Sequence, residues 1–248
     1  MSGEARSGGG GAAPAAPALY EPIDDFAAFG VRAFTTTRAA GSFSMHGDDP
    51  VSAVTARWAA LREEIGRGGA RRLATAGQVH GASVVAHSAG WEGWLRADAA
   101  DGHASVERGT GMAVTVADCV PVFIAHPGGA TALLHSGWRG TVGRIIERGI
   151  EALAQRGVPA GELHVHLGPA ICGKCYEVSP DVHGQLTGRA VDRPTTVDLR
   201  AVIADHARAA GVRHLSVSAL CTRCDNDRLF SHRAGDAGRQ LGVLVADP

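Results

Sequence analysis

One stretch, Val114 to Gly140, constrains the fold more than any other part of the chain. It reads VTVADCVPVFIAHPGGATALLHSGWRG and predicts two short apolar strands back to back. The first strand ends in Asp118-Cys119, and the second ends in the run from His135 to Gly140. A thiol and an imidazole that are held where stiff strands meet loops suit metal ligation or nucleophilic chemistry.

A second imidazole lies upstream in Gln78-Val79-His80-Gly81, in a similar setting at the edge of a strand. We hypothesise that His80, Cys119 and His135 hold one catalytic zinc ion, because a thiolate with two imidazoles suits zinc. Three protein ligands leave one position for a water molecule, whose pKa zinc lowers to about 7. No short-spacing motif joins the three residues. A buried cysteine with two ordinary histidines is therefore one alternative, and a Cys–His nucleophile pair is another.

Two Cys-x-x-Cys pairs, Cys172/Cys175 and Cys221/Cys224, suggest a rival metal site with four thiolates. The gap between the pairs is much longer than the roughly 15–20 residues of compact zinc ribbons. The intervening segment also reads as a complete helix plus a strand. The sequence therefore disfavours a single all-thiolate site and leaves the role of the pairs open. A thioredoxin-like role is weaker still, because neither pair opens a clear helix.

The charge balance limits the partners. The formal net charge is -1, which gives no support for non-specific binding to nucleic acid or to an anionic membrane. We find no apolar run of transmembrane length and no secretion-signal pattern. The five cysteines are an odd number, which favours reduced thiols and predicts a cytoplasmic protein. No protein partner can be inferred.

The chain is expected to form one α/β domain. Residues 1–18 are rich in Gly, Ala and Pro and predict a disordered tail, so that the folded domain covers residues 19–248. Asp49 is the expected N-cap of a helix with Pro50 at its first position, and Gly66 is its expected end. We expect Trp91 to His103 to be a loop with solvated polar side chains. From Thr141 onward, an apolar stripe predicts one helix that closes at Gly157.

Eight short motifs together resemble a known family. They are TTTR (35–38), GQVHG (77–81), ADCVPV (117–122), HSGWRGTV (135–142), GPAICGKCYEV (168–178), CTRC (221–224), LFSHR (229–233) and GRQ (238–240). In this order they resemble the bacterial multicopper polyphenol-oxidase-like, or laccase-domain, proteins. That family is now described as purine nucleoside phosphorylases with adenosine deaminase activity, and it has been linked to peptidoglycan editing.

The resemblance implies a four-layer α/β/β/α sandwich and one metal held by His80, Cys119 and His135. It implies phosphorolysis of adenosine, inosine, guanosine and methylthioadenosine, together with hydrolytic deamination of adenosine. The substrates would be purine nucleosides and phosphate, with zinc as the cofactor and copper as the alternative. Two further functions stay open: a copper-dependent polyphenol oxidase and a factor that edits peptidoglycan precursors. The segment from Ser42 to Asp49 is shorter than the family pattern, which bears on closure of the pocket.

Five further residues are candidates for substrate contacts. Arg38 or Arg139 would bind phosphate, aided by a helix N-terminus after Gly140. Asp118 is a candidate proton carrier, and its alternative is a turn residue that accepts backbone N–H groups. Trp138 is a candidate for stacking on a base, and packing against the hairpin is its alternative.

Overall fold

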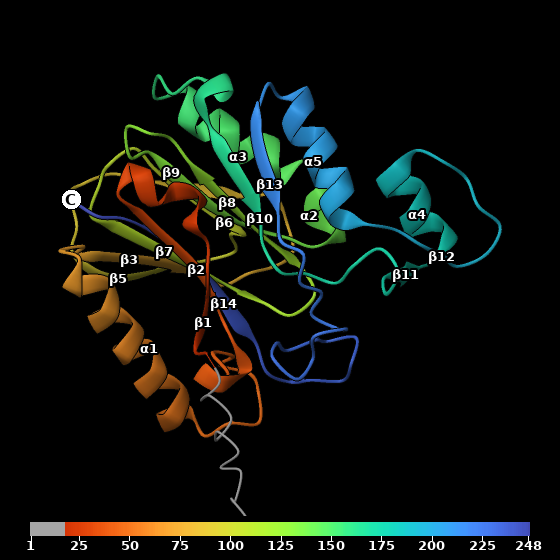
Figure 1. Ribbon diagram of the computed structural model, residues 1–248, viewed down its shortest axis with the longest axis horizontal. Helices are drawn as coiled ribbons and strands as arrows, with labels where there is room; N and C mark the ends of the chain where they lie inside the picture. Colours follow the sequence, from red (N-terminus) through yellow and green to blue (C-terminus); the bar gives the residue numbers. More distant parts are fainter. Residues whose placement is uncertain (1–17) are drawn as a thin grey trace, which may run out of the picture.

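Two six-stranded sheets carry the structure, a computed structural model that describes residues 18–248. All but the last residue of the expected tail at 1–18 lies outside the described residues. The first sheet has the order β1 (Tyr20–Pro22), β2 (Val31–Thr36), β14 (Gln240–Ala246), β7 (Thr110–Val116), β3 (Arg72–Ala76) and β5 (Gly93–Ala97). The helix α1 (Val51–Arg67) lies along its outer face (Figure 1).

The second sheet has the order β13 (His214–Val217), β10 (His164–Leu167), β8 (Val120–Ala125), β9 (Thr131–Ser136), β6 (Gly102–Ser105) and β4 (Val84–His87). Its outer face is covered by α2 (Trp138–Val142), α3 (Ile145–Ala154) and α5 (Leu199–Ala209) (Figure 1). The remaining elements are the small sheet of β11 (Glu177–Val178) and β12 (Thr195–Thr196), the helix α4 (Pro180–Thr187), and the 3-10 turns η1 (Asp24–Phe29), η2 (Arg38–Ala40) and η3 (Ala160–Glu162).

The apolar core fills the space between the four layers. Along β7, Met112 and Val114 pack between the two sheets, whereas Ala113 packs under α1, as the two-residue period of a strand requires. A third cluster joins the second sheet to α3 and α5. The layers are therefore α/β/β/α, and the expected fold class is confirmed.

Helix α1 shows why these residues form these elements. Its buried side chains are Val54, Trp58, Leu61 and Ile65, whose spacing places them on one face of the helix. Burying each of these side chains contributes about 1.5–3 kcal/mol to stability. The prediction was right about the helix and wrong about its ends. Pro50 occupies the N-cap position, the helix continues to Arg67, and the Asp49 carboxylate instead accepts a hydrogen bond from Arg57 at 2.5 Å.

Three other local predictions were wrong. The Val114–Gly140 stretch contains three strands, the end of β7 and all of β8 and β9, in place of two. The expected loop from Trp91 to His103 contains β5 and the start of β6, because each pairs with a parallel neighbour, β3 and β4 respectively. The single helix expected from Thr141 is two helices, since Arg144 adopts a left-handed conformation (φ 60°) between α2 and α3.

No helix within residues 18–248 combines the length and the apolar character that crossing a membrane requires.

Candidate metal centre

Two turns and one strand bring the predicted ligands together. Cys119 lies between β7 and β8, and the left-handed conformation of Asp118 (φ 85°) makes that turn tight. His135 lies on β9, where it pairs with Pro121 of β8. His80 lies in the loop after β3, also with a positive φ of 59°. One donor atom from each of His80, Cys119 and His135 lies within 4.8 Å of the others.

Asp101 holds two of these ligands in place. It is fully buried, and its carboxylate accepts a hydrogen bond from Nδ1 of His135 at 2.8 Å. The same carboxylate accepts the backbone N–H groups of Val79, His80 and Gly81, at 3.2, 2.9 and 2.7 Å. Because Nδ1 of His135 is engaged, Nε2 is the nitrogen left for a ligand. This carboxylate–histidine pairing is the usual support of a metal-binding imidazole.

The local charges favour the ligand form of the thiol. Burial raises the pKa of Cys119, but His135 and His80 outweigh it and bring the value down to about 6. Burial lowers the pKa of His135, but Cys119 and Asp101 raise it to about 9. Burial likewise opposes ionisation of Asp101, whereas the hydrogen bonds from His135 and Gly81 leave its pKa below the ordinary value. Cys119 is therefore a thiolate near neutral pH, the form that binds zinc.

The donor set fits zinc. A thiolate with two imidazoles is a ligand combination of catalytic zinc sites, in which a fourth position stays open. The three residues also line one cleft of about 1110 Å³, so a substrate has access to them. Other residues that line it include Ser44, Met45, His46, Gln78, Trp138, Arg139, Tyr176, His232 and Arg233. The shortened segment from Ser42 to Asp49 thus still contributes to the wall of the cleft.

The structure places Trp138 and Arg139 at the cleft and Gly140 away from it. The guanidinium of Arg139 lies over the Trp138 ring, 4.4 Å from its centroid. Gly140 is buried, and a Cβ there would lie 2.9 Å from the carbonyl oxygen of Gly81. The expected helix N-terminus after Gly140 is absent from this part of the described chain, since α2 already begins at Trp138.

Asp118 has both carboxylate oxygens occupied. One oxygen accepts the Thr222 hydroxyl at 2.6 Å, and the other accepts the backbone N–H of Arg233 at 2.7 Å. The residue is buried beside Cys119. These contacts favour the alternative that the sequence left open, a turn residue that fixes neighbouring loops.

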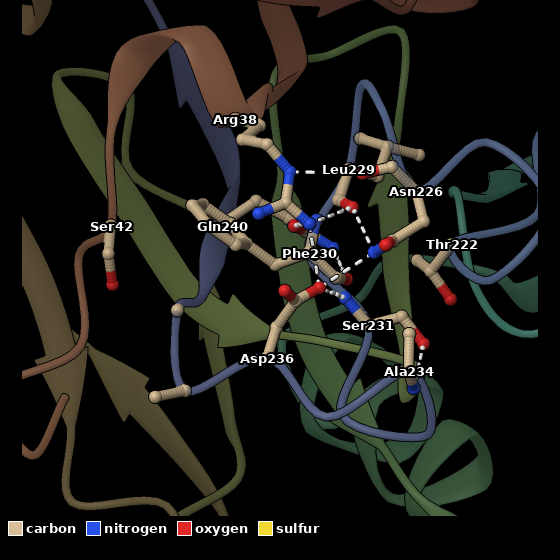
Figure 2. A network of polar contacts seen from close by, with 12 residues as sticks. Arg38, Ser42, Thr222, Asn226, Leu229, Phe230, Ser231, Ala234, Asp236 and Gln240 are labelled. Atoms are coloured by element: carbon tan, nitrogen blue, oxygen red, sulfur yellow. Dashed lines mark hydrogen bonds and ion pairs between the residues drawn. The ribbon is translucent and has the colours of Figure 1, made fainter. Parts of the chain in front are cut away.

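Arg38 is engaged in a structural network that Figure 2 shows. Its guanidinium donates to the Asp236 carboxylate at 2.7 Å and to the carbonyl oxygens of Asn226 and Leu229 at 3.0 and 3.2 Å. It also lies 4.5 Å from the centroid of the Phe230 ring. Arg38 does not line the cleft. It holds the segment from Asn226 to Asp236, part of which forms the cleft wall.

Sequence reasoning missed two kinds of residue. Asp101 falls within the stretch from Trp91 to His103 that the sequence predicts to be a loop with solvated polar side chains, although a carboxylate that supports a ligand histidine is a standard requirement of a metal centre. His103 is buried too, and its Nδ1 lies 3.0 Å from Nε2 of His87. Tyr176 and Arg233 of the cleft carried no sequence signal beyond their place in the family motifs.

Comparison with known proteins places the chain in a family. Residues 32–247 match the sequence model of the family described as multi-copper polyphenol oxidoreductase laccase. The chain belongs to this family. The resemblance drawn from the eight motifs is thereby confirmed.

Curated relatives carry two enzyme names. A purine nucleoside phosphorylase of Mycobacterium tuberculosis is 36% identical over 236 residues, which cover 87% of this chain and 91% of the relative. An adenosine deaminase from an unknown prokaryotic organism is 35% identical over 150 residues, 55% of each chain. Among solved structures, YlmD from Geobacillus stearothermophilus superimposes with a TM-score of 0.80 at 27% identity, covering 87% of this chain and 92% of that one.

Proposed function

We propose that this chain is a zinc-dependent purine nucleoside phosphorylase that also deaminates adenosine. The observation that carries the proposal is the convergence of His80, Cys119 and His135, with Asp101 behind them, on one open cleft. The enzyme names of the relatives supply the substrate class. The expected substrates are adenosine, inosine, guanosine and methylthioadenosine, with phosphate as the second substrate.

His80, Cys119 and His135 would hold the zinc ion, and Asp101 would keep the His135 imidazole in the right tautomer and orientation. When bound, zinc supplies Lewis-acid chemistry, by polarising the purine or by making hydroxide available at neutral pH. Neither phosphorolysis nor hydrolytic deamination is a redox reaction, so no described residue needs to supply an oxidant.

Arg139 is the proposed phosphate-binding residue. It is exposed at the cleft, and its charge is not paired with a carboxylate among the described ion pairs. A guanidinium matches phosphate by donating two parallel hydrogen bonds. The guanidinium packs on the face of the Trp138 ring in a cation–π contact. This contact is a different role from the base stacking that the sequence suggested for Trp138.

Copper oxidase chemistry is a weaker candidate. A three-copper cluster needs many histidines in one place. Within residues 18–248, the groups suited to a metal are His80/Cys119/His135 and a four-cysteine cluster, neither of which is histidine-rich. No feature of the cleft, as the described residues form it, favours a peptidoglycan precursor.

A cytoplasmic location remains a proposal, supported by the five cysteines, all of which are free.

The test is the phosphate dependence of base release. Inosine is incubated with the zinc-loaded protein, with and without phosphate, and hypoxanthine is measured; adenosine without phosphate tests the deaminase activity. We expect hypoxanthine only with phosphate, and we expect both activities to fall by at least about 100-fold in His80→Ala. His126→Ala, in the turn between β8 and β9 beside Glu162, is the matched control. Full activity of His80→Ala would exclude the proposed site.

A further inference from the structure

The two Cys-x-x-Cys pairs leave the second sheet from the same edge. Strands β10 and β13 are parallel neighbours, with Leu167 opposite Val217. Cys172 follows the end of β10 and Cys221 follows the end of β13, so both loops start side by side. A parallel bridge between Ala170 and Cys221 keeps the loops together beyond the strands. The long sequence gap that argued against a joint site is therefore closed by the sheet.

The sulfur atoms of all four cysteines converge. The sulfurs of Cys172, Cys175, Cys221 and Cys224 lie within 4.8 Å of one another, and those of Cys175 and Cys224 are 3.6 Å apart. A tetrahedral zinc with Zn–S bonds of about 2.3 Å separates its sulfurs by about 3.8 Å. The Cys175–Cys224 separation of 3.6 Å is close to such an edge, and the other sulfurs lie at most 4.8 Å apart, within about 1 Å of it.

Backbone amides point at one of these sulfurs. The N–H groups of Cys172 and Cys224 donate to Sγ of Cys221, at 3.2 and 3.5 Å. Hydrogen bonds of this kind stabilise a thiolate against protonation. Each Cys-x-x-Cys loop also contains one exposed cation, Lys174 or Arg223. These cations offset part of the net charge of -2 that four thiolates and a zinc ion carry.

We propose that Cys172, Cys175, Cys221 and Cys224 bind a second zinc ion, in a closed structural site with four thiolate ligands. Four protein ligands leave no position for substrate, so this ion stabilises the fold and takes no part in the reaction. The site is separate from the His80/Cys119/His135 centre in ligands and in purpose.

The proposed ion would stabilise the loops that form part of the cleft wall. Ile171, next to Cys172, donates its N–H to the Asp118 carbonyl at 3.1 Å. Thr222, next to Cys221, donates its hydroxyl to the Asp118 carboxylate. Tyr176 follows Cys175 and lines the cleft. Loss of the ion would therefore loosen the turn that carries Cys119, although no cysteine of this cluster lines the cleft.

The test measures zinc in a protein whose first site is disabled. The double variant His80→Ala/Cys119→Ala keeps all four cysteines of the cluster and is purified with a reductant in the presence of zinc. We expect about one tightly bound zinc per chain and, by X-ray absorption, a shell of sulfur alone at about 2.3 Å. Absence of zinc, or a shell with nitrogen and oxygen ligands, would overturn the proposal. A Cys175–Cys224 disulfide in the zinc-supplied, reduced protein would do the same.

A second variant separates the two sites. Cys175→Ser/Cys224→Ser removes two of the proposed ligands and leaves His80, Cys119 and His135 intact. We expect it to bind about one zinc fewer than the unmodified protein and to unfold at lower temperature. Equal zinc content in the two proteins contradicts the four-thiolate site. If the unmodified protein holds zinc at the cysteines alone, the proposed catalytic centre fails and this inference stands.

Discussion

The central residue of the site is Asp101, although it binds neither metal nor substrate in our account. Its carboxylate joins the His135 imidazole to the loop that presents His80. Four donors surround one buried carboxylate, so its charge is stabilised by hydrogen bonds in place of water. One side chain thus fixes the relative positions of two ligands that are 55 residues apart in the sequence.

The substitution Asp101→Asn tests this role. The amide has nearly the same shape, but it lacks the charge and offers one acceptor in place of two. We expect the affinity of the His80/Cys119/His135 site for zinc to fall about 10–100-fold, as is typical for loss of a partner of a ligand histidine. Competition with a chromophoric chelator measures the affinity. Asp98→Asn, at an exposed position nearby, is the control. An unchanged affinity in Asp101→Asn would refute the role.

Arg139 provides a second test at this scale. Removing its charge in Arg139→Gln deletes charged hydrogen bonds worth about 1.5–3 kcal/mol to phosphate. We expect the KM for phosphate in inosine phosphorolysis to rise about 10–100-fold. Deamination of adenosine, which uses no phosphate, should change little. Arg148→Gln, exposed on α3, is the matched control. A phosphate KM that stays the same in Arg139→Gln would remove Arg139 from the proposal.

At the scale of elements, β6 connects the site to the core of the second sheet. Asp101 directly precedes this strand, and all four of its residues are buried. The strand lies between β4 and β9, so the position of Asp101 depends on the pairing of both neighbours. His103 of β6 contacts His87 of β4 inside this region. Burial, followed by the neighbouring His87, lowers the pKa of His103 to about 3.

A low pKa of His103 makes the fold sensitive to acid. The unfolded chain binds a proton at His103 below about pH 6.5, whereas the folded chain stays neutral there down to about pH 3. The contribution of His103 to the free energy of unfolding is therefore fully present above about pH 6.5. It is lost as the pH drops toward 3. Between pH 7.5 and 5, this one group accounts for a loss of about 2 kcal/mol.

The substitution His103→Asn removes this titration and keeps an amide atom near the place of Nδ1. Urea unfolding at pH 7.5 and pH 5 should give a difference in stability about 2 kcal/mol smaller than in the unmodified protein. The absolute stability of the variant does not enter this comparison. His46→Asn, at an exposed position, should leave the difference as it is. An unchanged difference in His103→Asn would show that His103 does not carry the effect.

For the whole molecule, local sequence patterns predicted what depends on local chemistry. Buried strands such as β9 and the apolar face of α1 were found, because runs and periods of apolar residues record burial directly. The strand β5 was missed because it is a half-exposed edge strand, and β6 because its residues are small or polar. The break at Arg144 was missed because a left-handed conformation there leaves no mark on the apolar stripe.

The site residues likewise fall into those that local sequence patterns reveal and those that depend on strand pairing. The three proposed ligands lie in motifs at strand ends, which the sequence shows, and the sheets bring them together as expected. Asp101 and the four-cysteine cluster depend on which strands are neighbours, and no local pattern records that. The Cys172 and Cys221 loops meet only because β10 and β13 are adjacent and parallel. Arg38 illustrates the converse, because an arginine in a family motif pairs with Asp236 and does not itself line the cleft.

Anomalous X-ray diffraction at the zinc absorption edge shows whether His80, Cys119 and His135 hold a zinc ion. Crystals of the unmodified protein grown with zinc should show a strong anomalous peak bonded to the sulfur of Cys119 and to one nitrogen each of His80 and His135. Data collected below the edge should lose that peak, which assigns it to zinc. A map in which these three side chains are fully occupied but no anomalous peak lies among them would contradict the proposed zinc site.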